Sequence, residues 1–137
     1  GHPVIHVWLS STAEDGDFYA YLEDVDENGV STYITEGTLR ASHRALSDPP
    51  FNTMGLPFHR SYAEDVAALT PGDPVELVFE LQPTSNVFET GHRIRVTITG
   101  ADADNYEVLE LDPAPTYSIY RGGAQVSYID LPIIPAD

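Results

Sequence analysis

The side chains that could perform hydrolytic or metal chemistry are few and scattered in this sequence. No Gly-x-Ser-x-Gly segment occurs, although that turn presents the nucleophilic serine of α/β-hydrolases. The five histidines form no H-E-x-x-H zinc motif, and no phosphate-binding or dinucleotide-binding glycine motif is present. Cysteine is absent, which excludes thiolate nucleophiles, thiolate metal ligands and disulfides. We therefore predict no catalytic residue, no metal site and no cofactor in this chain.

Two groups of residues nevertheless leave metal binding open. His43 and His59 share one irregular segment and could converge on a metal, although hydrogen bonding within the loop is the interpretation we favour. The acidic stretches 14–17 and 24–29 carry oxygen ligands that suit Ca²⁺, but neither matches the EF-hand loop. Hairpin turns in which Asp and Asn side chains bond the local backbone explain the same residues.

Tyrosines offer a third candidate site. Tyr19, Tyr21 and Tyr33 fall on the two arms of a predicted hairpin and could form an exposed aromatic platform. Such platforms bind sugars by stacking, and tyrosine is equally common at protein interfaces; we favour an interface. A carbohydrate- or calcium-binding β-sandwich module remains the alternative function, and it depends on fold-level analogy alone.

The elements that would position these residues are strands, because apolar and polar residues alternate with a period of two. The Asn28-Gly29 pair predicts a hairpin, since both residues accept positive φ. We also expect one short helix within 61–69 and an optional short strand at 107–111. The seven main strands are expected at 4–9, 17–25, 31–39, 75–81, 92–99, 116–120 and 125–131. Seven short strands without an amphipathic helix predict an all-β antiparallel sandwich.

Two features of the pattern predict contacts. The strand at 4–9 is apolar at nearly every position, so both of its faces must be covered. Arg93 and Arg95 alternate with inward residues of their strand, and we expect them to pair with Glu76 or Glu80 on a neighbouring strand. Such exposed pairs contribute about 0–1 kcal/mol each.

The charge is strongly one-sided. The 137 residues include 22 Asp and Glu against 6 Arg and no Lys, for a net charge of −16. Nothing could neutralise a run of phosphates, so we predict neither a nucleic-acid partner nor docking to an anionic membrane. The acidic surface fits either ordinary solubility, which we favour, or life in high salt. We expect a cytoplasmic rather than a secreted protein, and the start without Met suggests a piece of a longer chain.

A series of short sequence segments along the chain carries a resemblance to a known family. In chain order, these segments are Asp17-Phe18, 22–25, 36–44, 71–74, 75–81, 83–88, 91–96, Gly122-Gly123 and 131–135. In this order and spacing they resemble the C-terminal domain of the X-Pro dipeptidyl-peptidase and cocaine-esterase-like (CocE/NonD) serine hydrolases. The resemblance covers nearly the whole chain.

This resemblance implies a jelly-roll β-sandwich of the galactose-binding-like type that packs on an α/β-hydrolase domain and helps to enclose its active-site region. The parent enzyme would be an esterase or dipeptidyl-peptidase, whereas this piece alone would not be an enzyme. Family domains begin about 70–80 residues earlier, against a usual domain size of about 100–150 residues. We therefore expect residues 1–137 to be one sandwich domain, incomplete at its N-terminal side, whose partner is its own hydrolase domain; a homo-oligomer is left open as a further partner.

The proline-rich stretch 43–62 is the predicted contact with that hydrolase domain. Three prolines and Gly55 break any regular element there, and long loops tend to be functional or interfacial. An equally weighted interpretation is that the loop folds over the sandwich's own edge. The predicted interdomain residues, all too apolar for a free loop, are Phe51, Met54, Leu56, Phe58 and Tyr62.

Overall fold

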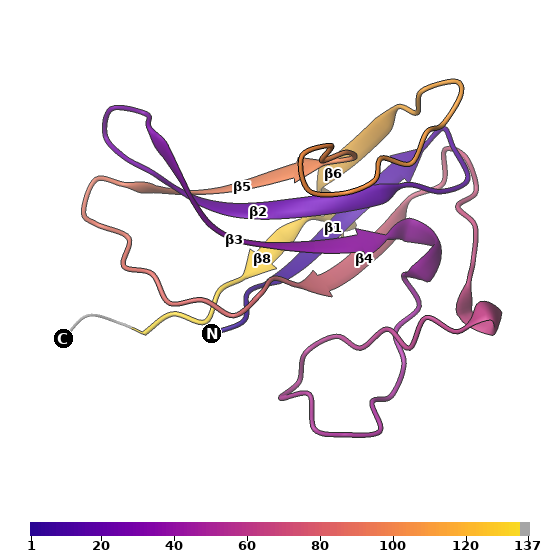
Figure 1. Ribbon diagram of the computed structural model, residues 1–137, viewed down its shortest axis with the longest axis horizontal. Helices are drawn as coiled ribbons and strands as arrows, with labels where there is room; N and C mark the ends of the chain where they lie inside the picture. Colours follow the sequence, from indigo (N-terminus) through magenta and orange to yellow (C-terminus); the bar gives the residue numbers. More distant parts are fainter. Residues whose placement is uncertain (135–137) are drawn as a thin grey trace.

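Two antiparallel sheets packed face to face make up the fold (Figure 1). The structure, a computed structural model, describes residues 1–134, so the last three residues of the domain predicted over 1–137 lie outside the described part. The strands are β1 (Val4–Ser11), β2 (Asp17–Val25), β3 (Ser31–Arg40), β4 (Val75–Glu80), β5 (Arg93–Thr99), β6 (Tyr117–Gly122), β7 (Gln125–Val126) and β8 (Tyr128–Asp130). Two single 3-10 turns, η1 (Ala41–His43) and η2 (Ala63–Asp65), are the helical elements of the described chain. Among residues 1–134, no helix is long and apolar enough to cross a membrane. The predicted all-β sandwich is confirmed.

Strand β1 is the centre of the larger sheet. It pairs with β4 along one edge, and with β6 and then β8 along the other, while β7 pairs with β6. Ser127 fills the break between β7 and β8: the Trp8 N–H donates to Ser127 Oγ at 2.9 Å, and that hydroxyl donates to the Tyr120 carbonyl at 2.6 Å. The smaller sheet has the order β3-β2-β5.

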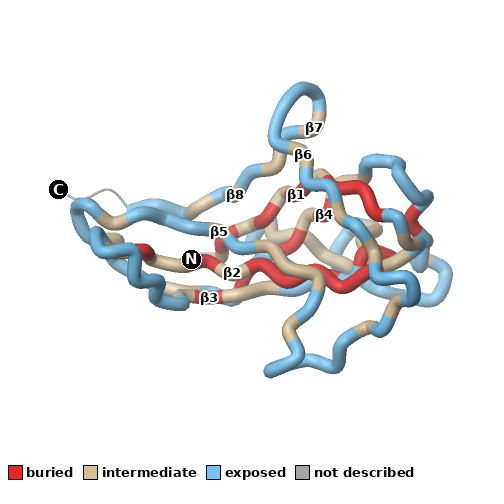
Figure 2. Tube along the Cα trace, turned by 90° about the horizontal axis from the view of Figure 1, so that it is seen from above, coloured by how far each residue is buried: buried red, intermediate tan, exposed pale blue. Residues whose placement is uncertain are grey.

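The core lies between the inward faces of the two sheets, as the alternation predicts. Figure 2 shows the buried residues along β1, β2 and β4, with the loops exposed. The buried inward residues of these strands and of the position after β4 are Ile5, Val7, Leu9, Phe18, Ala20, Leu22, Leu77, Phe79 and Leu81. Burial of one such side chain larger than alanine contributes about 1.5–3 kcal/mol, so this layer is a major source of the stability of the sandwich.

The β2–β3 hairpin forms where Asn28-Gly29 predicts it, but through a different turn. Only Gly29 has positive φ, at 86°. The Asp26 carboxylate accepts the N–H groups of Asn28 and Val30 at 2.8 Å each, and the Gly29 N–H donates to the Asp26 carbonyl at 3.1 Å. The side chain of Asp26 therefore closes a turn that needs one left-handed residue, not two.

Three other predictions need correction. Residues 107–111 are irregular, and the helix expected within 61–69 is the single turn η2. Arg95 pairs with Glu23 in a two-pronged contact of 2.8 and 2.9 Å. The predicted glutamates lie on β4 in the other sheet, whereas β5 borders β2, which carries Glu23. The ion pairs of the described residues join neither Arg93 nor Arg95 to Glu76 or Glu80.

One long side of the sandwich is closed by backbone contact between β3 and the end of β4. The Thr35 hydroxyl donates to the Gln82 carbonyl, and the Gln82 N–H donates to the Glu36 carbonyl, both at 2.8 Å. A Cβ at Gly37 would collide with the Glu80 carbonyl and come within 2.9 Å of Leu81 Cδ2. Glycine at 37 is therefore required for the sheets to meet.

We predict that Gly37→Ala lowers the free energy of unfolding by about 2–3 kcal/mol, because the new methyl group forces the β3 and β4 backbones apart. Gly122→Ala on β6 is the matched control, since its Cβ would meet nothing within 4 Å. The measurement is urea unfolding followed by far-UV circular dichroism. Equal effects of the two substitutions would show that the approach at Gly37 is not a constraint.

We also predict an acid-dependent loss of stability from Glu23. Its hydrogen bonds, first those from Arg95, lower its pKa from 4.5 to about 2. Because the pKa is lower in the folded state, this stability is fully present above pH 4.5 and is lost as the pH falls through about 2. Arg95 is 48% exposed, so water screens the pair and we expect a contribution of about 1 kcal/mol.

The measurement is the free energy of unfolding of the wild type and Glu23→Gln between pH 7 and pH 2. The variant should be less stable at pH 7 and should converge on the wild type toward pH 2. Glu107→Gln, an exposed site without an ion pair among the described residues, controls for the lost charge. Parallel curves for wild type and Glu23→Gln would contradict the assignment.

Candidate functional site

The loop formed by residues 44–62, which we call the projecting loop, is the largest irregular feature of the fold. Figure 1 shows it extending from the side of the sandwich where β3 ends and β4 begins, well away from both sheets. It contains all five residues predicted for an interdomain contact. Its base and its tip differ in how they are held, and this difference decides what the loop can do.

The base of the projecting loop is fastened by Arg44 and His59. The Arg44 guanidinium donates to the carbonyls of Ala41, Ala67 and Ala68, on both sides of the loop. His59 Nε2 lies 2.8 Å from the carbonyl of Val78, and its Nδ1 lies 3.2 Å from the carbonyl of Ala45. Val78 belongs to β4, an edge strand, so His59 occupies a carbonyl that the edge leaves unpaired.

A second fastening closes the C-terminal arm of the loop. Arg60 donates to both carboxylate oxygens of Asp65 at 2.6 Å, and its guanidinium lies over the ring of Tyr62, 4.9 Å from the ring centre. Asp65 also accepts the Tyr62 N–H at 3.2 Å. The hydrogen bonds from Arg60 lower the pKa of Asp65, which extends the range over which this contact stays ionic to more acidic pH.

The tip displays apolar side chains on an ordered turn. Met54 is 72% exposed and Phe51 61% exposed. Asn52 Oδ1 accepts the Met54 N–H at 2.8 Å, and Phe51 packs edge-on against Phe58 with ring centres 5.4 Å apart. The backbone of this turn therefore holds Met54 in water and leaves most of Phe51 exposed, with Phe58 packed against one side of its ring.

Backbone strain is concentrated in the same loop. Among the described residues, Met54 and Ser61 are the non-glycine residues with positive φ, at 61° and 52°. Such a conformation costs about 1 kcal/mol or more for a residue with a Cβ and clusters at binding sites. The sequence gives no signal for this strain, because nothing in the residue types around Met54 requires it.

The five predicted contact residues therefore divide between the two interpretations left open by the sequence. Phe51, Met54 and Tyr62 are exposed, whereas Leu56 and Phe58 are half-buried. The base covers the β4 edge through His59, as the edge-covering interpretation expects. The tip covers nothing in the described chain, which is the arrangement expected of a docking loop.

The tyrosine platform is a wrong prediction. Tyr19 is buried against Tyr106, with ring centres 4.7 Å apart. The Tyr21 hydroxyl donates to Asp102 at 2.6 Å, and burial together with this bond raises the tyrosine's pKa. Only Tyr33 is exposed. The segment that follows β5 covers Tyr19 and Tyr21 through Tyr106 and Asp102, so the three rings do not form the continuous exposed platform that sugar stacking would need.

The acidic stretches are occupied by contacts within the protein. Asp15 accepts the N–H and the hydroxyl of Ser42 at 2.9 and 2.7 Å. Asp17 forms a two-pronged ion pair with Arg40 at 2.7 and 2.8 Å, and Asp26 closes the β2–β3 turn. Within residues 1–134, no group of three or more His, Asp or Glu side chains is placed to hold a metal ion. Both ring nitrogens of His59 face carbonyls, so the pairing with His43 considered from the sequence lacks a free ligand atom.

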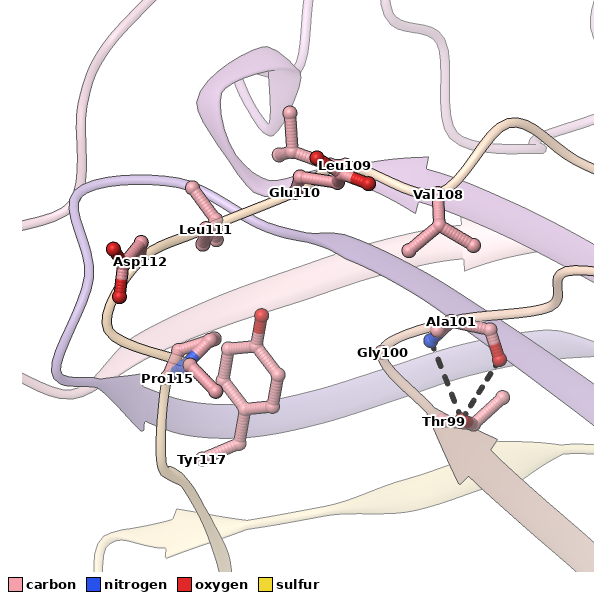
Figure 3. A pocket seen from close by; sticks show the side chains of 11 residues that line it. Thr99, Gly100, Ala101, Val108, Leu109, Glu110, Leu111, Asp112, Pro115 and Tyr117 are labelled. Carbon is pink, nitrogen blue, oxygen red and sulfur yellow. Dashed lines mark hydrogen bonds between the residues drawn. The ribbon is translucent and has the colours of Figure 1, made fainter.

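A shallow groove lies at the end of β5 (Figure 3). It has a volume of about 760 Å³ and runs between Tyr117 and the irregular segment 108–115. Its lining is mainly aliphatic, with Glu110 and Asp112 as the acidic members and no serine or histidine. It therefore contains no nucleophile–base pair.

The histidines of the described chain likewise do not activate a nucleophile. His92 Nδ1 lies 2.9 Å from Asp24, and His6 lies 3.3 Å from Glu76 and 3.5 Å from Asp130. No hydrogen bond among residues 1–134 joins a histidine to a serine hydroxyl. The described residues lack the constellation that acyl transfer needs.

Comparison with known proteins gives a consistent set of relatives. The sequence model of the X-Pro dipeptidyl-peptidase C-terminal non-catalytic domain matches residues 1–129. Putative serine esterases of Mycobacterium bovis and Mycobacterium tuberculosis are each 47% identical over 136 residues, which is 98% of this chain and 21% of theirs. Cocaine esterase of Rhodococcus is 29% identical over 140 residues, which is 93% of this chain and 22% of that protein. The chain thus spans about a fifth of the length of these curated relatives.

Solved structures agree on the fold. A CocE/NonD family hydrolase from Staphylococcus aureus superimposes with a TM-score of 0.78 at 24% sequence identity, over 94% of this chain and 27% of that one. A second crystal structure from the same organism gives a TM-score of 0.74 at 23% identity. At this level of identity the likeness concerns the fold.

The strained tip yields a prediction on stability. Because Met54 has φ of 61°, Met54→Gly removes the steric conflict of a Cβ in the left-handed region. We expect the free energy of unfolding to stay constant or to rise by about 0.5–1 kcal/mol. Leu46→Gly is the control: Leu46 lies in the same loop and is 57% exposed, but its φ is not positive, so glycine there should lower stability. Urea unfolding measures both, and equal losses would contradict strain at Met54.

Proposed function

The chain belongs to the family of X-Pro dipeptidyl-peptidase C-terminal non-catalytic domains, and we propose that it packs against the catalytic domain of a longer hydrolase chain through the projecting loop. The observation that carries the proposal is the tip: Phe51 and Met54 are held in water by a fastened base and a strained backbone. A fixed loop loses little conformational entropy on docking, so its apolar surface converts efficiently into binding free energy.

The chemical step belongs to the other domain in this proposal. Residues 1–134 bring no serine hydroxyl to a histidine, and the relatives named as esterases are about five times as long as this chain. The whole enzyme would cleave an ester or a peptide at a nucleophile outside this chain. The domain described here would supply walls around that site, and the choice of acyl or peptide substrate would be made mainly in the catalytic domain.

Charge supports a contact with a different surface rather than with a second copy. The chain carries −16 and no lysine, so two copies repel each other at every orientation that brings their acidic faces together. The tip is uncharged and mostly apolar from Phe51 to Phe58. A cavity between apolar side chains of the catalytic domain is the partner that such a tip fits best.

The proposal is tested in the longer chain with Met54→Gly. This substitution removes the most exposed apolar side chain of the tip, and we expect it not to lower the stability of the sandwich. We expect kcat/KM for a chromogenic ester to fall by about threefold or more, because a displaced domain misplaces the pocket wall. In calorimetry, the wild type should unfold in one transition, whereas Met54→Gly should unfold in two.

Val87→Gly is the matched control, because Val87 is 75% exposed and apolar but lies in the connection between β4 and β5. If Met54→Gly has the same kcat/KM and the same single unfolding transition as Val87→Gly, the projecting loop is not the docking surface. The chain of residues 1–137 alone should show no esterase activity above background, and activity there would refute the assignment of the nucleophile to another domain.

A further inference from the structure

Arg44, at the base of the projecting loop, differs from the arginines that form ion pairs. Arg40, Arg60 and Arg95 each bind one carboxylate in the same way: Nε donates to one of its oxygens and Nη2 to the other, at distances between 2.6 and 2.9 Å. This two-pronged fork is the geometry in which a guanidinium matches a carboxylate. Arg44 carries the same fork, but within residues 1–134 it forms no ion pair.

The hydrogen bonds that Arg44 does form leave its fork free. Nη1 donates to the carbonyls of Ala41 and Ala67, and Nη2 donates to the carbonyl of Ala68 at 3.4 Å. A guanidinium has five N–H groups, so two have no partner in the described chain, one on Nε and one on Nη2. The three carbonyls hold the group in place but bring no negative charge to balance it.

Burial makes this imbalance costly. Arg44 is half-buried, and a charge that is partly removed from water without a counter-ion costs free energy. A shortage of acidic residues does not explain it, because 22 Asp and Glu stand against six Arg. Arg93 and Arg121 also form no ion pair among the described residues, but both are exposed and water solvates them. Arg44 is therefore the half-buried arginine whose counter-ion is missing.

The projecting loop also differs in charge from the remainder of the chain. Residues 44–62 hold two Arg and one Asp, whereas all other residues together hold four Arg and 21 Asp or Glu. Arg60 is balanced by Asp65 and Glu64, which leaves Arg44 as the cation to be matched. An acidic group on another surface is repelled by most of this domain, but the loop can receive it.

The backbone beneath Arg44 is fixed to the sandwich. Arg44 follows η1 directly, where the Ala41 N–H donates to the Gly16 carbonyl at 2.9 Å and Ser42 is held by Asp15. The guanidinium is therefore presented from a rigid support. Because little conformational entropy is lost when a carboxylate binds a group already held in place, such a fork suits recognition of a second surface.

We propose that a carboxylate of the catalytic domain binds the free fork of Arg44 when the projecting loop docks. The partner surface then combines an apolar cavity for the tip with an Asp or Glu side chain that meets the base of the loop. The inference rests on the proposed function, because it names the chemical group that the same loop recognises. The ion pair sets the orientation in which the loop docks, whereas the apolar tip supplies affinity.

The absence of lysine from this chain allows a direct test within the longer chain. Arg44→Lys introduces one side-chain amine at the base of the loop, and a carbodiimide joins an amine to a carboxylate when the two are in contact. We expect mass spectrometry to find an amide bond from position 44 to an Asp or Glu of the catalytic domain. Arg93→Lys is the matched control, because Arg93 is exposed and lies opposite Val25, beside the β2–β3 turn at the other end of β3. We expect no such bond from position 93.

A second pair of variants separates the charge of Arg44 from its bonds to carbonyls. Glutamine keeps N–H donors for the carbonyls but has no charge. Arg44→Gln should lower the Tm of this domain in the longer chain by about 5 °C or more, because the carboxylate of the catalytic domain is left unpaired. Arg44→Lys keeps the charge and should lower the Tm by less than half as much. Equal losses would assign Arg44 to the structure of the loop alone and overturn the inference.

The crosslinking result also separates this inference from the proposed function. Bonds from position 44 only to residues within 1–137 or to a second copy of the chain, or no bond at all, overturn the inference. If this happens while Met54→Gly lowers kcat/KM, the loop docks through its tip alone. If the bond to the catalytic domain forms while Met54→Gly behaves like Val87→Gly, docking through the tip is wrong and the ion pair stands.

Discussion

The requirement to cover the inward face and both edges of β1 organises this fold. On the outward face Val4, His6 and Trp8 are only half-buried, so the predicted cover of both faces is incomplete. Ile5, Val7 and Leu9 face the smaller sheet, while both edges of the strand are hydrogen-bonded, to β4 on one side and to β6 and β8 on the other. A strand so apolar cannot lie at an edge without inviting aggregation. Because β1 is central, three later strands, β4, β6 and β8, must pair with it. The loops that connect these strands must be long enough to allow this pairing.

Much of the fold was predictable from local pattern, and the reason is that side-chain alternation is a local property. The strands at 17–25 and 75–81 match β2 and β4 to within one residue. Pairing partners were not predictable in the same way, because Arg95 meets Glu23 through a sheet order that no short segment encodes. The tyrosine platform failed for the same reason: the residues that cover Tyr19 and Tyr21 are about 80 positions away in the chain.

The candidate site was half predictable. Composition alone indicated that Phe51 and Met54 are too apolar for an ordinary loop, and the structure places both in water. For His59 the sequence predicted hydrogen bonding within the loop, which is confirmed. The partners were not predictable, since Arg44 and His59 act on backbone carbonyls, which every residue carries and no sequence pattern marks. Whether the contact residues meet a catalytic domain remains a proposal, because that surface belongs to another part of the longer chain.

The left-handed backbone at Met54 is a local cost of the projecting loop, and the Asn52 side chain that accepts the Met54 N–H holds the turn in this form. Local costs of this kind persist when the surrounding structure or a partner makes the arrangement favourable. The strain lies at the tip, beside the exposed side chains of Phe51 and Met54. This coincidence supports the proposal that the tip meets a partner surface in the longer chain, because a turn that served only to connect β3 to β4 would not need a left-handed residue with a Cβ.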